Sequence, residues 1–293
     1  MPDDLAFLSL TEAVRRIRSG DLSPVKYTQA LLDRIAAHDG QLDSFLRVLD
    51  DGALEGAALA ELAVKNGETL GPLHGVPFAL KDIVDVAGLP TTAHSQILAQ
   101  QPPKTDHATV TAKLHNAGGI LLGKTAPHEF AIGGPSFDLP WPPARNPWNR
   151  ARYPGGSSSG SGAAVAAGLV PMAIGTDTGG SVRNPATACG IVGMKPTYGR
   201  VSRRGVFPLS FSLDHVGPMT RNVADNALML NVIAGHDPGD PGSANLPTPD
   251  FTADLDKGVD GLSIGVIRHF HNRDMTAEPE MQSQVVLVSL SRA

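Results

Sequence analysis

Two turns rich in glycine, serine and threonine lie close together within residues 153–200, and they restrict how this chain can fold. The first turn covers residues 155–162, and the second covers residues 176–181. They are separated by a small-residue segment at 163–168, which can be helical, and by an apolar run at 169–174, which fits a strand. The order turn, helix, strand, turn can return both serine clusters to one place.

Glycine-rich turns that also carry hydroxyl groups have the composition of a catalytic site. Glycine allows a positive φ angle and lets other groups approach the backbone closely. Successive peptide N–H groups in such a turn can converge on an anion. A serine hydroxyl becomes a nucleophile when a neighbouring base removes its proton. The two turns therefore predict an active site that contains serine.

The sequence around these turns resembles the signature of the amidase signature family. The resemblance is carried by GGSSSGSGAAVAAGLVP at 155–171 and by GTDTGGSVRNPATACGIVGMKPTYGRVS at 175–202. A third matching segment, GVPFALKD, lies upstream at 75–82. Members of this family hydrolyse carboxylic amides with a Ser–Ser–Lys triad, and their bridging serine follows a cis peptide bond.

By position, the resemblance implies that Ser181 is the nucleophile, Ser157 the bridging serine and Lys81 the base. A lysine base must be neutral, so the pKa of Lys81 must fall well below its ordinary value of about 10.4. Burial at the end of the apolar run 76–80 would lower the pKa in this way. The implied reaction needs no metal and no cofactor, because backbone N–H groups stabilise the oxyanion. The expected donors of this oxyanion hole are Thr178, Gly179, Gly180 and Ser181.

The rest of the chain predicts an α/β fold, namely the amidase signature fold with a mixed, mostly parallel sheet covered by helices on both faces. Residues 1–70 are expected to form a helical region that packs on a core of residues 71–293. Short apolar runs at 76–80, 120–122 and 262–267 fit buried strands. Helix signals occur at 9–20, 23–40, 50–67, 108–115 and 222–235.

Composition and charge narrow the expected partners. The chain has 293 residues, 41% of them hydrophobic, and a net charge of −5 with both signs interspersed. This charge pattern indicates no basic surface that would bind nucleic acid, and no apolar run is long enough to span a membrane. One cysteine and the absence of a charged-then-apolar leader fit a cytoplasmic protein. The expected partner is a small-molecule amide, and assembly as a homodimer stays open.

Several alternatives remain open at this point. The family resemblance fades after about residue 239, so we expect the core to be incomplete at its C-terminal end. The chain could be the amidase (A) subunit of a glutamyl- or aspartyl-tRNA amidotransferase, which shares the triad, or an inactive truncated remnant. It could also pass its acyl group to an amine instead of water. The segment DIVDVAGLPTTAHS at 82–95 reads more like free-standing amidases.

Two further segments fit known binding or catalytic motifs in the wrong context, and a third is a long loop. Residues 118–125 fit the P-loop pattern, but a strand-like middle and a following proline are the wrong context for phosphate binding. Residues 156–160 fit the G-x-S-x-G elbow, but no strand leads into them. The long irregular loop at 132–154 carries both tryptophans, and we expect it at the mouth of the substrate pocket.

Overall fold

The computed structural model describes residues 5–139, 141–261 and 263. The chain forms two compact units, residues 1–250 and residues 251–293. In the second unit, the described residues form mainly turns. Apart from residue 263, the strand predicted at 262–267 lies outside the described residues.

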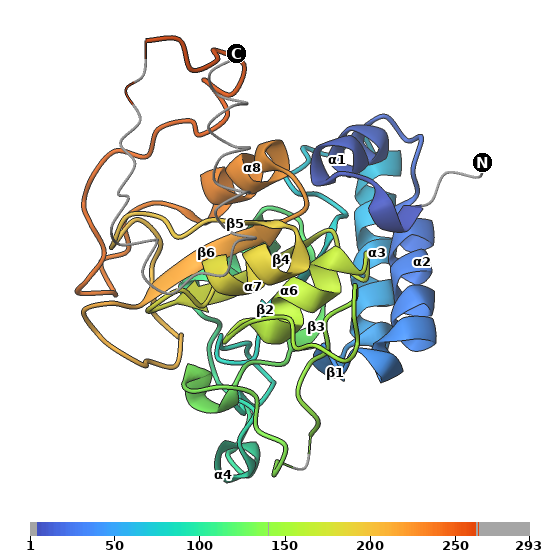
Figure 1. The fold of residues 1–293 in the computed structure, drawn as a ribbon. Helices are drawn as coiled ribbons and strands as arrows, with labels where there is room; N and C mark the ends of the chain where they lie inside the picture. Colours follow the sequence, from blue (N-terminus) through green and yellow to red (C-terminus); the bar gives the residue numbers. More distant parts are fainter. Residues whose placement is uncertain (1–4, 140, 262, 264–293) are drawn as a thin grey trace. The chain divides into compact units, whose positions relative to one another are not determined.

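A six-stranded mixed sheet forms the centre of the first unit (Figure 1). Its strand order is β1-β3-β2-β4-β6-β5. The central strands β3, β2 and β4 are parallel, whereas β1 and β6 run antiparallel to their neighbours and β5 runs antiparallel to β6. β3, β2, β4 and β5 therefore share one direction, which confirms the predicted mixed α/β sheet. The strands are β1 (Phe45–Val48), β2 (Pro77–Lys81), β3 (Ile120–Thr125), β4 (Met172–Asp177), β5 (Val192–Gly193) and β6 (His215–Thr220).

Helices flank this sheet. Helix α6 packs on the central strands, α8 packs on β6 and β5, and α2 and α3 lie side by side at one edge of the molecule (Figure 1). The α-helices are α1 (Leu10–Arg18), α2 (Pro24–His38), α3 (Asp50–Lys65), α4 (Gln96–Ala99), α5 (Thr109–Asn116), α6 (Ser159–Ala166), α7 (Arg183–Cys189) and α8 (Val223–Ile233). Short 3-10 turns occur at Leu5–Phe7, Asp39–Gln41 and Glu129–Ala131.

Capping residues set the helix starts that the sequence predicts. The hydroxyl of Ser9 accepts a hydrogen bond from the N–H of Glu12, and α1 begins directly after Ser9. Ser23 caps α2 in the same way, with Pro24 at its first position. Asn222 caps α8. The predicted helices at 9–20, 23–40 and 222–235 are therefore confirmed.

The N-terminal region contributes more than helices. Strand β1 pairs antiparallel with β3 and forms one edge of the sheet. It has only four residues and lies between two helices, so no alternation of apolar and polar residues marks it in the sequence. Residues 1–70 thus form the expected helices and, in addition, contribute one edge strand to the sheet.

The three central strands are wholly buried, as expected for parallel strands covered by helices. Residues 118–125 supply β3 and the glycine turn before it, so they form no phosphate loop. Parallel strands end at the same edge of a sheet, where open α/β folds place their ligand sites. Lys81 ends β2, Thr125 ends β3 and Asp177 ends β4, so this edge is the candidate site.

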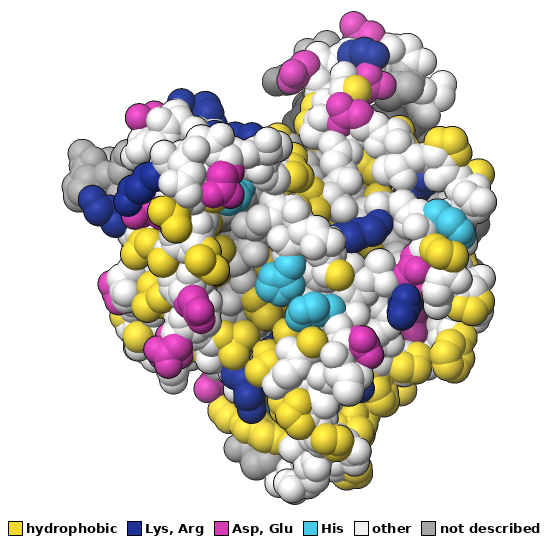
Figure 2. All heavy atoms as spheres, turned by 180° about the vertical axis from the view of Figure 1, so that it is seen from behind, with side chains coloured by type: hydrophobic (Ala, Val, Ile, Leu, Met, Phe, Trp, Pro, Cys, Tyr) yellow, Lys and Arg dark blue, Asp and Glu magenta, His cyan; other side chains and the backbone are white. Residues whose placement is uncertain are grey.

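The surface carries both charge signs. On the face shown in Figure 2, Lys and Arg side chains are interspersed with Asp and Glu, and neither sign gathers into one large patch of described atoms. None of the helices in the described part of the chain is long and apolar enough to cross a membrane.

The carboxylate of Asp225 connects the first and last α-helices of this unit. It accepts hydrogen bonds from the N–H groups of Leu10, at 2.8 Å, and Thr11, at 2.9 Å. Asp225 lies in the first turn of α8 and is fully buried. An acidic group stabilises the N-terminus of a helix, and here one carboxylate serves two helix starts.

We expect the Asp225→Ala variant to lose about 3 kcal/mol of unfolding free energy, because two buried N–H groups lose a charged acceptor. Urea denaturation measures the loss. The matched control is Asp33→Ala, since Asp33 is an exposed residue of α2. Equal midpoints for the two variants would contradict this role of Asp225.

Candidate active site

The structure brings Lys81 and Ser157 into direct contact. The side chain of Lys81 is fully buried, and its Nζ lies 2.8 Å from Ser157 Oγ. Nζ also lies 2.8 Å from the Oγ1 of Thr176, on the neighbouring strand β4. Two of the three predicted triad residues therefore meet at the carboxyl ends of β2 and β4. Thr176 is a further contact that the sequence did not single out.

The surroundings of Lys81 favour its neutral form. Burial lowers the pKa of Lys81 to about 7, against the opposing pull of the carboxylates of Asp177 and Asp214. Burial has this effect because a charged ammonium loses its hydration in a low-dielectric interior. In the described part of the chain, no carboxylate forms a hydrogen bond with Lys81, so a large fraction of the amine is neutral near pH 7.

A second buried lysine shows why Lys81 lacks a carboxylate partner. Lys124 lies on the adjacent strand β3, and its Nζ pairs with Asp82 Oδ1 at 2.6 Å. Asp82 lies in the turn directly after Lys81, and Lys124 is in register with Leu80, whose side chain points to the face opposite that of Lys81. Asp82 also accepts hydrogen bonds from the hydroxyl and the N–H of Thr92. The carboxylate of Asp82 thus pairs with Lys124, and the hydrogen-bond partners of Lys81 among the described residues are hydroxyl groups.

The first glycine turn holds Ser157 in place. The peptide bond between Gly156 and Ser157 is cis, as the family resemblance implied. The carbonyl of Ser157 accepts a hydrogen bond from the N–H of His128, at 2.9 Å. The His128 ring covers Gly156 so closely that a Cβ there would lie 2.1 Å from its Cε1. Only glycine fits at this position, and the contact fixes the backbone that carries Ser157.

The other serines of the first turn form hydrogen bonds with backbone groups of neighbouring segments. Ser158 Oγ bonds both the N–H and the carbonyl of Thr176. Ser159 Oγ donates to Ala126 O, and Ser161 Oγ donates to Ile174 O. Helix α6 begins at Ser159, four residues earlier than the predicted segment 163–168. These bonds tie α6 to the ends of β3 and β4.

The second turn places Ser181 next to the first. Ser181 lies between β4 and α7 and is partly exposed. Its carbonyl accepts a hydrogen bond from the N–H of Ser158, at 3.2 Å, which joins the two turns. Among the described residues, no side chain forms a hydrogen bond with Ser181 Oγ. Catalytic hydrogen bonds often tighten only when substrate binds, so the Ser157–Ser181 step stays a prediction.

The predicted oxyanion hole needs one correction. The N–H of Gly180 donates to Asp177 Oδ1 at 2.8 Å, so it is not available to an oxyanion, and its prediction is wrong in this structure. In the part of the chain that the structure describes, the N–H groups of Gly179 and Ser181 bind no acceptor. Gly179 is exposed, and a Cβ there would meet no atom within 4 Å. Thr178, Gly179 and Ser181 stay predicted as donors.

Asp177 and Arg183 form a structural ion pair. Arg183 reaches Asp177 with two side-chain nitrogens, at 3.0 and 2.9 Å. Asp177 also accepts from the N–H of Val182 at 3.1 Å. Burial alone would raise the pKa of Asp177, but these donors lower it below its ordinary value. The carboxylate thus shapes the second turn and stays charged.

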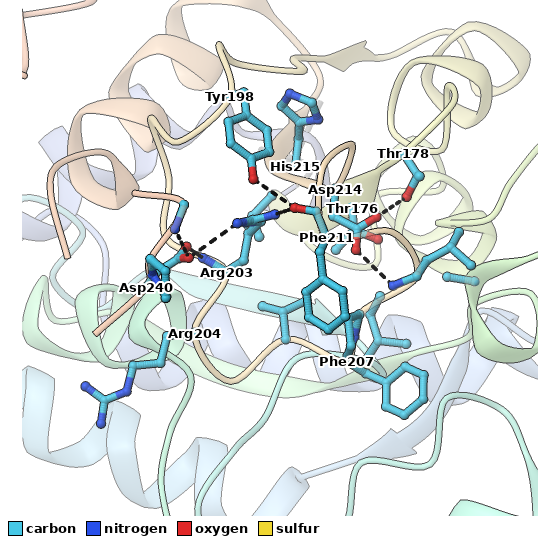
Figure 3. Close-up of a pocket in the computed structure, with 18 of the residues that line it drawn as sticks. Thr176, Thr178, Tyr198, Arg203, Arg204, Phe207, Phe211, Asp214, His215 and Asp240 are labelled. Atoms are coloured by element: carbon cyan, nitrogen blue, oxygen red, sulfur yellow. Dashed lines mark hydrogen bonds and ion pairs between the residues drawn. The ribbon is translucent and has the colours of Figure 1, made fainter. Parts of the chain in front are cut away.

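A cavity of about 510 Å³ adjoins this site (Figure 3). Thr176 and Thr178 line it, together with residues 198–216 and 239–242 in part. The loop at 132–154 does not line this cavity, and its expected place at the mouth of the substrate pocket stays a prediction. Its Trp148 instead donates from Nε1 to Cys189 O at 2.7 Å.

No group of three His, Cys, Asp or Glu side chains suited to a metal ion occurs in the described ranges.

Comparison with protein families agrees with this geometry. The model of the Amidase family matches residues 26–293. The chain belongs to the Amidase family. It is 47% identical, over 281 residues, to the A subunit of glutamyl-tRNA(Gln) amidotransferase from Chloroflexus aggregans, covering 96% of this chain and 57% of that protein. The chain thus spans little more than half the length of such curated relatives.

Solved structures show the same Amidase fold. The native peptide amidase from Stenotrophomonas maltophilia superposes with a TM-score of 0.79 and 41% identity, covering 85% of this chain and 53% of that one. The A subunit of glutamyl-tRNA(Gln) amidotransferase from Thermotoga maritima gives a TM-score of 0.86 and 35% identity, covering 100% and 61%. The predicted amidase signature fold is therefore confirmed.

We expect the Thr176→Val variant of this Amidase-family chain to react about tenfold more slowly with a fluorophosphonate, which traps activated serines. Valine keeps the shape of threonine but removes the oxygen that holds Lys81 Nζ, and a factor of ten corresponds to about 1.4 kcal/mol. The control is Thr187→Val, an exposed threonine of α7. Equal rates for both variants would refute the positioning role of Thr176.

The lowered pKa of Lys81 also predicts a pH-dependent stability. Between about pH 7 and about pH 10, the unfolded chain binds a proton on Lys81 that the folded chain has released. Stability therefore rises with pH in this window, and below it the folded state bears the full desolvation of the ammonium. Relative to Lys81→Met, the wild type should gain roughly 2 kcal/mol of unfolding free energy from about pH 7 to about pH 9.

Urea denaturation at several pH values measures this difference. The matched control is Lys65→Met, because Lys65 is an exposed lysine of α3 and should follow the wild type in its pH dependence. Parallel pH curves for the wild type and Lys81→Met would show that Lys81 keeps its ordinary pKa.

Proposed function

We propose that this chain carries the catalytic centre of an enzyme that cleaves carboxylic amides through an acyl-enzyme, with Ser181 as nucleophile, Ser157 as proton bridge and Lys81 as base. The observation that supports this most is the fully buried Lys81, with a pKa lowered to about 7, at 2.8 Å from Ser157 Oγ. A neutral amine in contact with a serine hydroxyl is the arrangement that general-base activation requires.

In the first half of the reaction, Lys81 Nζ takes the proton of Ser157 while Ser157 takes the proton of Ser181. Ser181 Oγ then forms a bond with the amide carbonyl carbon, and the carbonyl oxygen becomes an oxyanion. N–H groups of the second turn, such as that of Gly179, stabilise this charge. When the C–N bond breaks, Ser157 gives its proton to the leaving nitrogen and regains one from Lys81.

In the second half, a water molecule replaces the amine. The same relay removes a proton from the water, whose oxygen attacks the acyl carbon. As the bond between the acyl carbon and Ser181 Oγ breaks, the relay returns that proton through Ser157 to Ser181 Oγ, and the carboxylic acid is released. Thr176 supports both halves. A neutral amine has two N–H donors and one lone pair, so a bond donated to Thr176 Oγ1 leaves the lone pair for the hydroxyl of Ser157.

A second candidate function is the glutaminase step of an amidotransferase. It is favoured by the relative from Chloroflexus aggregans, at 47% identity, and by the structure from Thermotoga maritima, since each of these proteins is the A subunit of a glutamyl-tRNA(Gln) amidotransferase. The acyl-enzyme chemistry would be the same, but the substrate would be glutamine and the ammonia would pass to a partner protein. Ammonia release confined to L-glutamine would support this candidate over simple hydrolysis of other amides.

We expect a fluorophosphonate probe to label the purified chain with one equivalent and to leave Ser181→Ala unlabelled. Lys81→Met should slow labelling at least about a hundredfold, because the nucleophile loses its base. Mass spectrometry of the labelled peptide locates the site. Ser19→Ala is the matched control, since Ser19 is an exposed serine at the end of α1. Normal labelling of Ser181→Ala would rule out this assignment.

A further inference from the structure

The cavity beside Thr176 and Thr178 is lined mainly by apolar and aromatic side chains. Phe207 packs against Phe130 with ring centroids 5.9 Å apart, which fixes one wall. Phe211, on the same segment, is 79% exposed although it lines the cavity. A large apolar side chain left open at a cavity is a typical contact for a ligand. The other apolar lining residues are Ile83, Ala131, Val206, Pro208, Leu209, Val216 and Pro241.

Arg203, one of the two arginines that line this cavity, is paired with an acid inside the protein. Arg203 NH2 lies 3.4 Å from Asp240 Oδ1, and its guanidinium stacks over the ring of Tyr198 at 4.7 Å (Figure 3). Its NH1 donates to the carbonyl of Phe211. Its Nε–H is buried and binds no acceptor in the described residues. The charge of Arg203 is therefore paired with Asp240 within the protein.

Asp214, one of the two acids that line this cavity, is held by hydrogen bonds within the protein. Asp214 accepts hydrogen bonds from Thr178 Oγ1 at 2.6 Å and from the N–H groups of Leu209 and Ser210 at 2.8 and 2.9 Å. The side chain of Arg204 points away from the phenyl rings in Figure 3. It lies near Asp237 and helps to lower the pKa of that carboxylate, after burial and hydrogen bonds are counted.

The imidazole at the cavity also has partners within the protein. His215 Nδ1 lies 2.6 Å from Leu213 O and 3.2 Å from Asp177 O. Its Nε2 lies 3.3 Å from Lys195 Nζ. Arg203, Asp214 and His215 thus all have partners within the protein, and Arg204 points away from the phenyl rings (Figure 3).

We propose that this cavity receives the acyl part of the substrate and selects an apolar, uncharged group, preferably an aromatic one, with Phe207 and Phe211 as specificity-determining residues. This inference rests on the proposed function, because the acyl group it describes belongs to the amide that the site would cleave. Its test, however, measures binding and not cleavage. An α-amino acid amide such as glutamine would lose the hydration of two charges here and gain no partner for either. An arylalkyl amide would bury its ring against the phenylalanines.

Calorimetric titration of the intact chain with 4-phenylbutyramide and with L-glutamine tests the proposal without requiring turnover. We expect a dissociation constant for 4-phenylbutyramide at least about tenfold below that for L-glutamine. Equal affinity, a preference for glutamine or no binding of the arylamide up to millimolar concentration would overturn it. Fluorophosphonate labelling is run in parallel, so failure of the triad shows as absent labelling while the binding preference is still measured.

Two variants locate the binding. Phe211→Ala should raise the dissociation constant of 4-phenylbutyramide about tenfold, and its exposure means that truncation leaves the core intact. Phe207→Ala should act in the same direction. The matched control is Phe137→Ala, since Phe137 is 66% exposed and lies outside the cavity lining. Unchanged affinity in Phe211→Ala, or an equal loss in Phe137→Ala, would place the arylamide elsewhere and contradict the proposal.

Discussion

The candidate site depends on a hydrogen bond between a buried amine and a serine hydroxyl, Lys81 to Ser157. Burying a lysine is unfavourable unless it is paired or neutral. The protein uses both solutions on adjacent strands: Lys124 is paired with Asp82, whereas Lys81 has only hydroxyl partners and a lowered pKa. Because Asp82 follows Lys81 directly, the alternation of the strand separates the two environments. A one-residue slip of β2 would exchange them and remove the base.

The two glycine-rich turns must also be held next to this amine. Hydrogen bonds from serine hydroxyls to backbone groups hold them there: Ser158 binds Thr176 on β4, and Ser161 binds Ile174. The N–H of Ser158 also binds the carbonyl of Ser181. The turns are thus anchored to the central, fully buried strands, and a site on rigid elements keeps its geometry better than one on free loops.

The sequence predicted those parts of the molecule that leave a local signal. Capped helices and the apolar strand before Lys81 were found, and the glycine turns led to Ser157. Thr176 was missed because its role depends on the register between β2 and β4, which no local pattern records. Gly180 was misjudged because a turn of free N–H groups looks the same whether or not a carboxylate such as Asp177 occupies one of them. The edge strand β1 is too short to show a period.

The carboxylate of Asp225 has a consequence for the order of assembly. Its hydrogen bond to Leu10 spans 215 positions of the chain. Helix α1 is translated well before α8, so the acceptor for its leading N–H groups becomes available only after most of this unit has been synthesised. Contacts of such long range form late and slow folding, because loop closure must precede them. We therefore expect α1 to dock on α8 last, after the sheet has formed.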